Sequence, residues 1–579
     1  MSRATAEAPL FDFAEQNARV SEGGYHQPGP RLRGPARWRL LTVSVVFAVA
    51  FAAVGGKLML NAAPRTVSPA NAAVLPDGGG REFAPRASIV DRRGELLAYS
   101  LPFDSLYANP QEVRDPAKVA AALQTVLPDL KAASVAKSLA NKKREFAYLA
   151  RHLTPSQHSA ILEMGIPGLY FRKEYRRLFP RGRLAAHVVG AVKEDHRGGL
   201  SGIEAFFDAD LASTPDLPLA LSIDMRVQHI VYEEVQRAID RFDAIGGFGI
   251  MMDVNTGEVI ASVSLPDFDP NRLETLTRET RVNKVAGGAY ELGSMFKLLT
   301  SAAALDQGVA SEQTKFDASK PLYTHGHKIS DFRGENRWLT MREVLVHSSN
   351  IGAARMAELI GTPNMVKYLG GFGLFAKAGI ELNESTRPIL PAKWSDIYAK
   401  TASFGHGISV TPLQFVSAIG AVSNGGTLLR PTMLKVPEGT ETTGMRVIST
   451  KTSARVRKLM RAVVVEGSGK GANSRFYHVG GKTGTAEKNI NGRYQKDKRL
   501  SSFIGAFPIE NPRYVVMVSV DEPKGRKDTL GYATGGWVSA PAVGKIVERV
   551  APMLGIEKAG PEEKTQQRGL QTASMRVRH

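Results

Sequence analysis

The stretch Ser294-Met295-Phe296-Lys297 places a potential nucleophile and a potential base three residues apart. Gly293 precedes it, and an Ala/Leu-rich run with helical character follows. Residues at positions i and i+3 share one face of a helix, so the Ser294 hydroxyl and the Lys297 amine can come within hydrogen-bond reach. A serine that forms an acyl-enzyme needs such a base. The pattern alone is weak, because a helix-capping serine and a solvated lysine produce the same spacing by chance.

Two further motifs follow downstream and complete an ordered series. They are Ser348-Ser349-Asn350 and Lys482-Thr483-Gly484-Thr485. Each alone could be an ordinary turn or a glycine-rich hairpin, but the ordered set SxxK, SxN, KTG is that of penicillin-binding proteins and serine β-lactamases. The series therefore predicts a serine acyl-transfer site. The candidate catalytic residues are Ser294, Lys297, Ser348 and Lys482, and the candidate substrate-binding residues are Asn350, Thr483, Gly484 and Thr485.

Length, charge and cysteine content narrow the function classes. The chain has 579 residues and a formal net charge of +19, which suggests several structural units and attraction to anionic surfaces such as a membrane or a cell-wall polymer. Nucleic acid fits poorly, because the sequence has no recognised nucleic-acid motif and no basic stripe interleaved with aromatic residues. There is no cysteine, and the histidines show no HExxH spacing, so neither a metal nor another cofactor is predicted.

An uncharged run from Leu40 to Gly56, extended by Leu58 to Leu60, has about the length that spans a bilayer. Four arginines lie between residues 31 and 39 with no acidic residue among them, which places the N-terminus in the cytoplasm. A cleaved signal peptide is the competing interpretation, but the leader and the apolar run are both long for one. We expect a cytoplasmic tail over residues 1–37 and an uncleaved membrane helix over residues 38–60.

Composition and periodicity divide the next part of the chain into a linker and a first folded unit. Residues 61–85 are rich in proline and glycine and are expected to form a linker. Residues 86–220 are expected to form a non-catalytic domain, which begins with two strands joined at Arg93-Gly94 and continues with helical spacing over 116–140. The Gly- and Arg-dense block from Arg177 to Glu204 is interpreted as the far end of this unit. Its alternatives are a solvated loop with a capping glutamate and a second catalytic centre, although no nucleophile and base pair is evident there.

Residues 221–556 are expected to form the catalytic unit. The expected elements are a helix over about 225–241 capped by Asp224, strands over 246–253 and 258–264, strands over 501–507 and 514–521, and a closing helix over about 541–553. Strands at both ends with helices between them predict an α/β unit, α+β in detail, with a central antiparallel sheet flanked by helices. Residues 557–579 are polar and are expected to form a disordered tail.

The stretch Arg86-Ala87-Ser88-Ile89-Val90-Asp91-Arg92-Arg93-Gly94 resembles the first pedestal motif of the class B penicillin-binding proteins, with Ala87 in place of the usual glycine. The block from Arg177 to Glu204 resembles the later pedestal motifs, with Phe179 where tyrosine is commoner. The resemblance extends from about Arg86 to Ile556 and implies the penicillin-binding transpeptidase fold, preceded by an elongated pedestal of the dimerisation type over residues 86–220. Residues 290–294, 347–352 and 405–414 look like the division-specific branch, although elongation-specific members carry the same core motifs.

The resemblance implies a serine D,D-transpeptidase that cross-links peptidoglycan stem peptides ending in D-Ala-D-Ala during septal wall synthesis. β-Lactams would inhibit it by acylating Ser294, and the backbone amides of Ser294 and Thr485 would form the oxyanion hole. The segment between the membrane helix and the catalytic unit is too short for a pedestal and a glycan polymerase together, so a separate polymerase and other division proteins are expected partners. The expected location is the inner membrane, with a single pass and a periplasmic catalytic unit at the septum.

Residue chemistry suggests how the candidates divide the reaction. A free lysine is protonated at neutral pH, so Lys297 can act as a base only if burial and the nearby Lys482 cation depress its pKa. Ser348 can relay a proton to the leaving D-alanine, and Asn350 can hold the peptide backbone unless it is only a turn residue. Residues 482–485 are expected to form an edge strand that pairs with an extended peptide. There Gly484 would leave no side chain between strand and substrate, and the hydroxyls of Thr483 and Thr485 would bind a terminal carboxylate.

Three other functions stay open at this point. In a D,D-carboxypeptidase or a β-lactamase, water replaces the acceptor amine. An elongation-specific transpeptidase would use the same motifs, and a non-catalytic protein would only organise division partners. A class A β-lactamase uses a glutamate that acts through water. The nearest acid to the nucleophile, Glu291, is expected to cap a turn or to pair with a surface cation instead.

Overall fold

The structure is a computed structural model that describes residues 85–194, 198–490 and 492–560. The predicted N-terminal tail and membrane helix, and all of the predicted linker except Pro85, lie outside these residues. So does the predicted C-terminal tail beyond residue 560. Within the described ranges, no helix is both long enough and apolar enough to cross a membrane.

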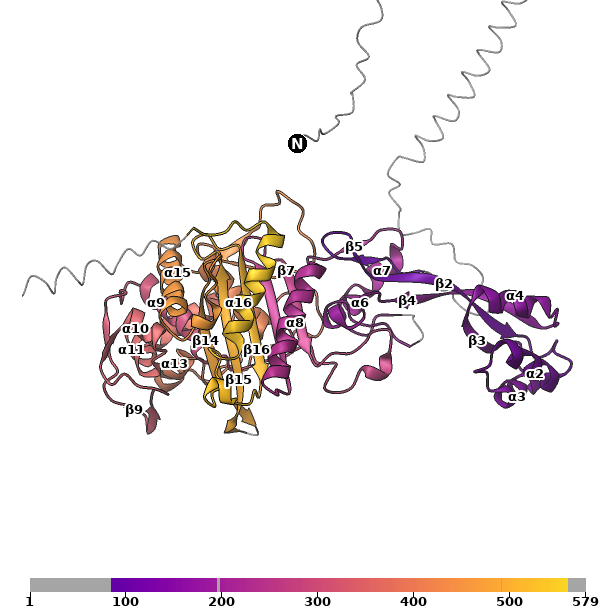
Figure 1. The fold of residues 1–579 in the computed structure, drawn as a ribbon, viewed down its shortest axis with the longest axis horizontal. Helices are drawn as coiled ribbons and strands as arrows, with labels where there is room; N and C mark the ends of the chain where they lie inside the picture. The colour runs from indigo at the N-terminus through magenta and orange to yellow at the C-terminus, as the bar shows by residue number, and fades with distance from the viewer. Residues whose placement is uncertain (1–84, 195–197, 491, 561–579) are drawn as a thin grey trace, which may run out of the picture. The chain divides into compact units, whose positions relative to one another are not determined.

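The N-terminal part is built on one long strand, β2 (Leu96–Ala108) (Figure 1). A turn at Gly94, with φ +89°, joins it to β1 (Ile89–Val90), as the sequence predicted. Two later strands, β3 (Ala147–Leu153) and β4 (Leu169–Leu178), pair with β2 in antiparallel orientation. Three helices pack against these strands and enclose an apolar core of their own. The helices are α2 (Pro116–Val126), α3 (Ala132–Ala140) and α4 (Pro155–Glu163). The predicted helical stretch over 116–140 therefore forms two helices, which separate at Pro128 because proline cannot continue a helix.

A buried cluster of three charged residues, Arg86, Arg177 and Glu204, lies at the end of the pedestal next to the catalytic unit. Glu204 is fully buried and accepts from the Arg86 Nε at 3.0 Å and from the Arg177 Nε at 2.6 Å. Two guanidinium groups from distant parts of the sequence thus neutralise one carboxylate, which makes its burial possible. The alternative of a solvated loop with a capping Glu204 is therefore wrong. The short elements around this cluster are η1 (Gly182–Ala185), α5 (Ala186–Val189), α6 (Gly202–Phe206), α7 (Asp208–Ser213) and β5 (Leu219–Ala220), which pairs in parallel with β1.

The catalytic unit is built around a five-stranded antiparallel sheet. In spatial order its strands are β14 (Gly480–Ile490), β15 (Arg493–Phe507), β16 (Tyr514–Asp521), β6 (Gly246–Asp253) and β7 (Val259–Leu265). Alternate side chains of these strands enter two different apolar cores, so helices cover both faces of the sheet. The predicted α+β unit with a central antiparallel sheet flanked by helices is confirmed.

Two helices cover one face of the sheet, α8 (Met225–Arg241) and α16 (Ser539–Val550). The predicted bounds of α8 are confirmed, and its N-cap Asp224 accepts from the Arg226 backbone N–H at 3.0 Å. α16 begins two residues before the prediction, and the short turn η6 (Pro552–Leu554) replaces its predicted end. β15 begins at Arg493 rather than near Ser501, because β14 and β15 continue past the sheet as a polar hairpin.

The chain between β7 and β14 forms a mostly helical layer on the other face of the sheet. Its centre is α9 (Lys297–Asp306), whose side chains are buried along most of its length. The helices of this layer also include α10 (Met341–Val346), α11 (Asn350–Ile360), α12 (Thr362–Gly371), α13 (Asp396–Ala402), α14 (Pro412–Ser423) and α15 (Thr450–Val465). The connecting turns and strands of this layer are η2 (Leu273–Thr275), η3 (Gly293–Phe296), β8 (Lys315–Asp317), β9 (Leu322–Thr324), β10 (His327–Ile329), β11 (Trp338–Thr340), β12 (Thr427–Leu429), β13 (Gly444–Arg446) and η4 (Lys470–Ala472). A further short turn, η5 (Lys527–Thr529), lies between β16 and α16.

Candidate active site

Ser294 lies in the tight turn η3, immediately before α9 begins at Lys297. The Lys297 amine is fully buried and lies 2.7 Å from the Ser294 hydroxyl, a hydrogen-bond distance. Gly293 has φ +58°, a conformation that side chains rarely adopt, and a Cβ there would come 3.0 Å from the Thr485 carbonyl oxygen. This turn therefore holds Ser294 close to β14, the edge strand of the sheet.

The turn before α11 carries the second motif. Ser348 adopts φ +61°, a strained conformation for a residue other than glycine and one that is common at functional sites. The Lys297 amine lies 2.9 Å from the Ser348 carbonyl oxygen, 3.3 Å from its hydroxyl and 2.7 Å from the Asn350 side-chain oxygen. A neutral amine has two N–H donors and one lone pair. Because the two carbonyl oxygens can only accept, they take both N–H groups, and the lone pair remains for a hydroxyl such as that of Ser294.

Lys482 approaches the same point from β14. Its amine lies 3.0 Å from the Ser348 hydroxyl and 3.2 Å from that of Thr483, so Ser348 stands between two buried lysines. Burial, followed by the nearby charge of Lys482, holds the pKa of Lys297 well below its usual value. Burial also lowers the pKa of Lys482 to about 7. Both effects act on Lys297, and they favour the neutral amine that the predicted base needs.

The third motif lies on β14, which pairs with β15 and leaves its outer edge without another strand among the described residues. The Thr483 hydroxyl lies 2.7 Å from that of Ser468, and the Thr485 hydroxyl accepts from the Gly535 backbone N–H at 3.2 Å. A Cβ at Gly484 would lie 2.5 Å from the Leu292 carbonyl oxygen. The reason expected for Gly484 is thus corrected, because this glycine lets β14 approach the serine turn rather than the substrate.

Asp331 is a residue of the site that the sequence did not reveal. One carboxylate oxygen accepts from the backbone N–H groups of Asn350 at 2.6 Å and Ile351 at 3.0 Å, and the other accepts from the Ser349 hydroxyl at 2.7 Å. These N–H groups have no partner within helix α11, and a carboxylate is favourable at a helix N-terminus. Asp331 thus holds the turn that positions Ser348. No motif marks it in the sequence.

Asn350 and Glu291 are each engaged within the protein. The Asn350 side chain also donates to the Ser330 carbonyl at 3.2 Å, so both ends of its amide have protein partners. Glu291 accepts from the Gly407 backbone N–H at 3.0 Å and from the Tyr494 hydroxyl at 2.8 Å. This carboxylate therefore ties the polar β14–β15 hairpin to the serine turn.

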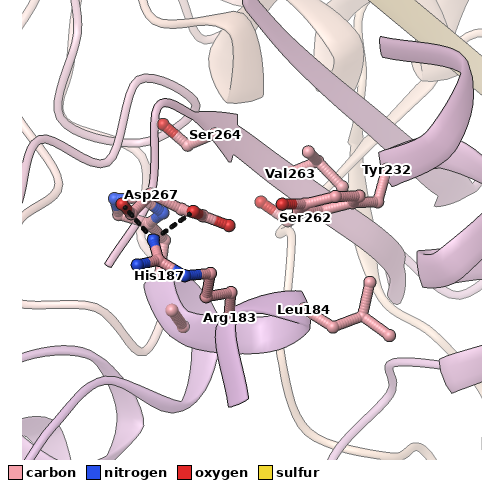
Figure 2. A pocket seen from close by; sticks show the side chains of 9 residues that line it. Arg183, Leu184, His187, Tyr232, Ser262, Val263, Ser264 and Asp267 are labelled. Carbon is pink, nitrogen blue, oxygen red and sulfur yellow. Dashed lines mark hydrogen bonds and ion pairs between the residues drawn. The ribbon is translucent and has the colours of Figure 1, made fainter. Parts of the chain in front are cut away.

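A second set of titratable side chains lies where the pedestal meets α8 and β7 (Figure 2). Arg183 donates to the Asp267 side chain at 3.1 Å, and burial raises the pKa of that carboxyl. Burial lowers the pKa of His187 to about 4, so its ring is neutral at neutral pH. None of the eight predicted site residues lines this small polar pocket, whose lining is Arg183, Leu184, Ala186, His187, Tyr232, Ser262, Val263, Ser264 and Asp267. Among the described residues, no group of three or more metal-ligating side chains is placed to hold a metal ion.

Comparison with known families agrees with this geometry. The family model of the penicillin-binding protein transpeptidase domain matches residues 247–548, and that of the penicillin-binding protein dimerisation domain matches residues 81–217. A probable peptidoglycan D,D-transpeptidase FtsI of Caulobacter vibrioides is 40% identical, over 82% of each chain. The peptidoglycan D,D-transpeptidase FtsI of Escherichia coli is 32% identical, over 82% of this chain and 84% of the relative.

Two solved structures share the fold. Penicillin-binding protein 3 of Mycobacterium tuberculosis, complexed with aztreonam, has a TM-score of 0.65 at 24% identity, over 83% of this chain and 98% of that chain. Penicillin-binding protein 2X of Streptococcus thermophilus has a TM-score of 0.69 at 20% identity, over 82% and 80%. The chain therefore belongs to the class B penicillin-binding proteins, with a dimerisation domain before the transpeptidase domain. The resemblance to this family, which the sequence motifs predicted, is confirmed. The prediction that the chain is a serine peptidoglycan D,D-transpeptidase is confirmed as well.

Proposed function

We propose that this chain cross-links peptidoglycan stem peptides during septal wall synthesis, through an acyl-enzyme on Ser294. The observation that carries the proposal is the buried Lys297 amine, 2.7 Å from the Ser294 hydroxyl and with its two N–H groups directed to carbonyl oxygens. Neutral Lys297 takes the proton as the Ser294 oxygen attacks the carbonyl carbon of the penultimate D-alanine. The bond to the terminal D-alanine then breaks, and Ser348 passes a proton to the leaving amine.

In the second half of the reaction, the amine of a neighbouring stem peptide attacks the acyl-enzyme. A new amide forms, and Ser294 regains its proton. The backbone amides of Ser294 and Thr485 are the proposed donors to the developing oxyanion. Lys482, Thr483 and Thr485 are the proposed partners of the terminal carboxylate, while the outer edge of β14 pairs with the extended peptide.

Hydrolysis is the competing outcome for the acyl-enzyme. One oxygen of Glu291, the acid nearest to Ser294 in sequence, accepts from Gly407 and Tyr494, and the other lies 3.6 Å from the His406 Nδ1. This carboxylate is thus engaged with neighbouring loops, which supports transfer to an amine. The test uses the full-length protein in detergent with a stem-peptide donor and an amine acceptor. We expect more cross-linked product than free acid at saturating acceptor. Release of free acid alone would identify a carboxypeptidase. Penicillin-binding protein 3 of Mycobacterium tuberculosis, which shares this fold, was solved in complex with aztreonam. We propose that β-lactams inhibit this chain by acylating Ser294.

The septal role and the membrane anchor are the finer parts of the proposal. Relatives named FtsI at 32% and 40% identity support division rather than elongation. Depletion of the protein should then produce filaments, whereas rounded cells would indicate the elongation role. The uncharged run within residues 38–60 is the proposed single inner-membrane helix, with the catalytic unit in the periplasm and a separate glycan polymerase as partner. Full-length protein should stay in the membrane fraction after a high-salt wash, which removes proteins held only by charge.

A further inference from the structure

A contact between Arg333 and Tyr532 joins the two loops that flank the catalytic residues. The Arg333 guanidinium donates a hydrogen bond to the Tyr532 hydroxyl. The central carbon of the guanidinium also lies 4.7 Å from the centre of the Tyr532 ring, which is a cation–π distance. The two residues are 199 positions apart in the sequence, so the contact connects separate walls of the site.

Each partner is a short distance along the chain from a residue that holds a motif. Arg333 follows Asp331, whose carboxylate binds the turn of Ser349 and Asn350. Tyr532 precedes Gly535, whose backbone N–H donates to the Thr485 hydroxyl. Two or three residues of chain reach at most about 7–11 Å, so the pair lies close to both the second and the third motif. Arg333 is exposed, so its guanidinium is accessible from solvent, whereas Lys297 and Lys482 are fully buried.

The positive charge of Arg333 is not neutralised by a neighbour. Among the described residues, no carboxylate lies within 4.0 Å of its guanidinium, and the oxygens of Asp331 already accept from the turn. Arg337, on the same loop, differs because it donates to Glu343 at 2.8 Å. Stacking on the phenol ring holds the guanidinium in place and leaves its outer N–H groups free to donate hydrogen bonds. The planar guanidinium is suited to pair with a carboxylate through two such hydrogen bonds.

We propose that Arg333, held by Tyr532, is a specificity-determining residue that receives a carboxylate carried by the acyl donor near its reacting end. This inference rests on the proposed transpeptidase function and names its substrate class. The donor would be a stem peptide with a side-chain carboxylate on a residue before the D-Ala-D-Ala end. A β-lactam with a carboxylate on its acyl side chain would use the same contact.

Three penicillins test this charge preference, because they differ at one carbon of the acyl side chain. Benzylpenicillin carries no charge there, carbenicillin a carboxylate and ampicillin an amine. Their acylation rates are measured on full-length protein in detergent, by competition with a fluorescent penicillin. We expect Arg333→Gln to lower the carbenicillin-to-benzylpenicillin rate ratio about fivefold, the upper range for an exposed ion pair. Arg333→Glu should lower it further and raise the ampicillin-to-benzylpenicillin ratio. In the wild type, the carbenicillin preference should weaken as salt increases.

Two control variants separate charge recognition from bracing of the loop. Arg333→Lys keeps the charge but loses the planar pairing, so its carbenicillin preference should lie between those of the wild type and Arg333→Gln. Arg337→Gln should leave the preference unchanged. The inference is overturned if Arg333→Gln leaves the ratio as in the wild type, or if it slows all three penicillins equally. A stem-peptide donor and its counterpart lacking the side-chain carboxylate should repeat the result. A wild-type protein that none of the penicillins acylates would contradict the proposed function itself, which distinguishes the two failures.

Discussion

The hydroxyl oxygen of Ser348 lies 3.0 Å from the side-chain nitrogen of Lys482. The same hydroxyl lies 3.3 Å from the nitrogen of Lys297, so one small side chain connects the two buried lysines. Protons held by groups this close are lost in coupled steps that belong to the pair. The proposed acylation step needs neutral Lys297 with charged Lys482, a protonation state that exists only between the two steps.

The pH dependence of acylation follows from this arrangement. The acylation rate should rise as pH passes the strongly lowered pKa of Lys297, and fall as Lys482 loses its proton at a pKa of about 7. Lys482→Arg keeps a charge that does not titrate, so its profile should lack the falling limb. Labelling rates with a fluorescent penicillin between about pH 5 and 9 would show this. A falling limb that persists in Lys482→Arg would assign it to another group.

Asp331 should matter for rate although it does not touch the nucleophile. Asp331→Asn removes the charge and one acceptor from the turn before α11, so Ser348 and Asn350 lose their fixed position. Small displacements of catalytic groups cost up to about a hundredfold, and we expect a tenfold or greater loss in the acylation rate. Asp317→Asn is the matched control, because Asp317 binds Ser319 in a similar turn of a nearby loop. Equal rates for Asp331→Asn and the control would contradict the positioning role.

Gly484→Ala should disrupt the contact between β14 and the serine turn. The new Cβ would lie 2.5 Å from the Leu292 carbonyl oxygen and 3.0 Å from the Met295 side chain, so one of the two segments must move. Penicillin labelling should fall at least tenfold. The free energy of unfolding should decrease by about 1–3 kcal/mol, as it does when side chains are overpacked. Gly560→Ala is the control, because no atom of the described residues lies within 4 Å of a Cβ there. Normal labelling of Gly484→Ala would show that the close approach is not needed.

Replacing a catalytic lysine should stabilise the fold. A lysine whose pKa is lowered in the folded protein binds its proton more weakly than in the unfolded chain. For Lys482, the cost to the free energy of folding is largest below pH about 7 and disappears as pH rises from there to the usual pKa of 10.5. Lys482→Met should raise the Tm at pH 7 by about 3 °C or more, with a gap that narrows towards pH 10. Lys488→Met, which breaks ion pairs at 2.9 and 2.8 Å on the same strand, should not raise it. A lower Tm for Lys482→Met would contradict the burial cost.

The sequence predicted the parts of this fold that local patterns determine. The helix α8 shows apolar periodicity and an aspartate cap, and the buried strands are apolar runs between turns, so both could be located. The first residues of β15 were missed because they are polar and pair in a hairpin beyond the sheet. The burial of Glu204 was not evident either, because the two arginines that neutralise it come from distant segments.

The candidate site shows the same division. Its motif residues could be named from the sequence, because acyl transfer needs a serine, a lysine base and a cationic edge strand in a known order. Asp331 and the contact between Arg333 and Tyr532 depend on tertiary placement of loops without a motif. The sequence predicted that Gly484 makes room for the substrate, whereas this glycine makes room for the serine turn. Sequence does not show which side of a strand packs against a turn.

Mass-spectrometric mapping of the penicilloyl adduct is the most direct test of the central claim that Ser294 is the nucleophile of a transpeptidase. After a brief penicillin pulse, full-length protein should carry a single adduct on the peptide that contains Ser294, and the adduct should persist for many minutes. Ser294→Ala should show no adduct while keeping the Tm of the wild type within a degree or so, because it removes one partly exposed hydroxyl. An adduct on another serine would contradict the assignment of the nucleophile. Rapid loss of the adduct with repeated turnover of penicillin would instead identify a hydrolase.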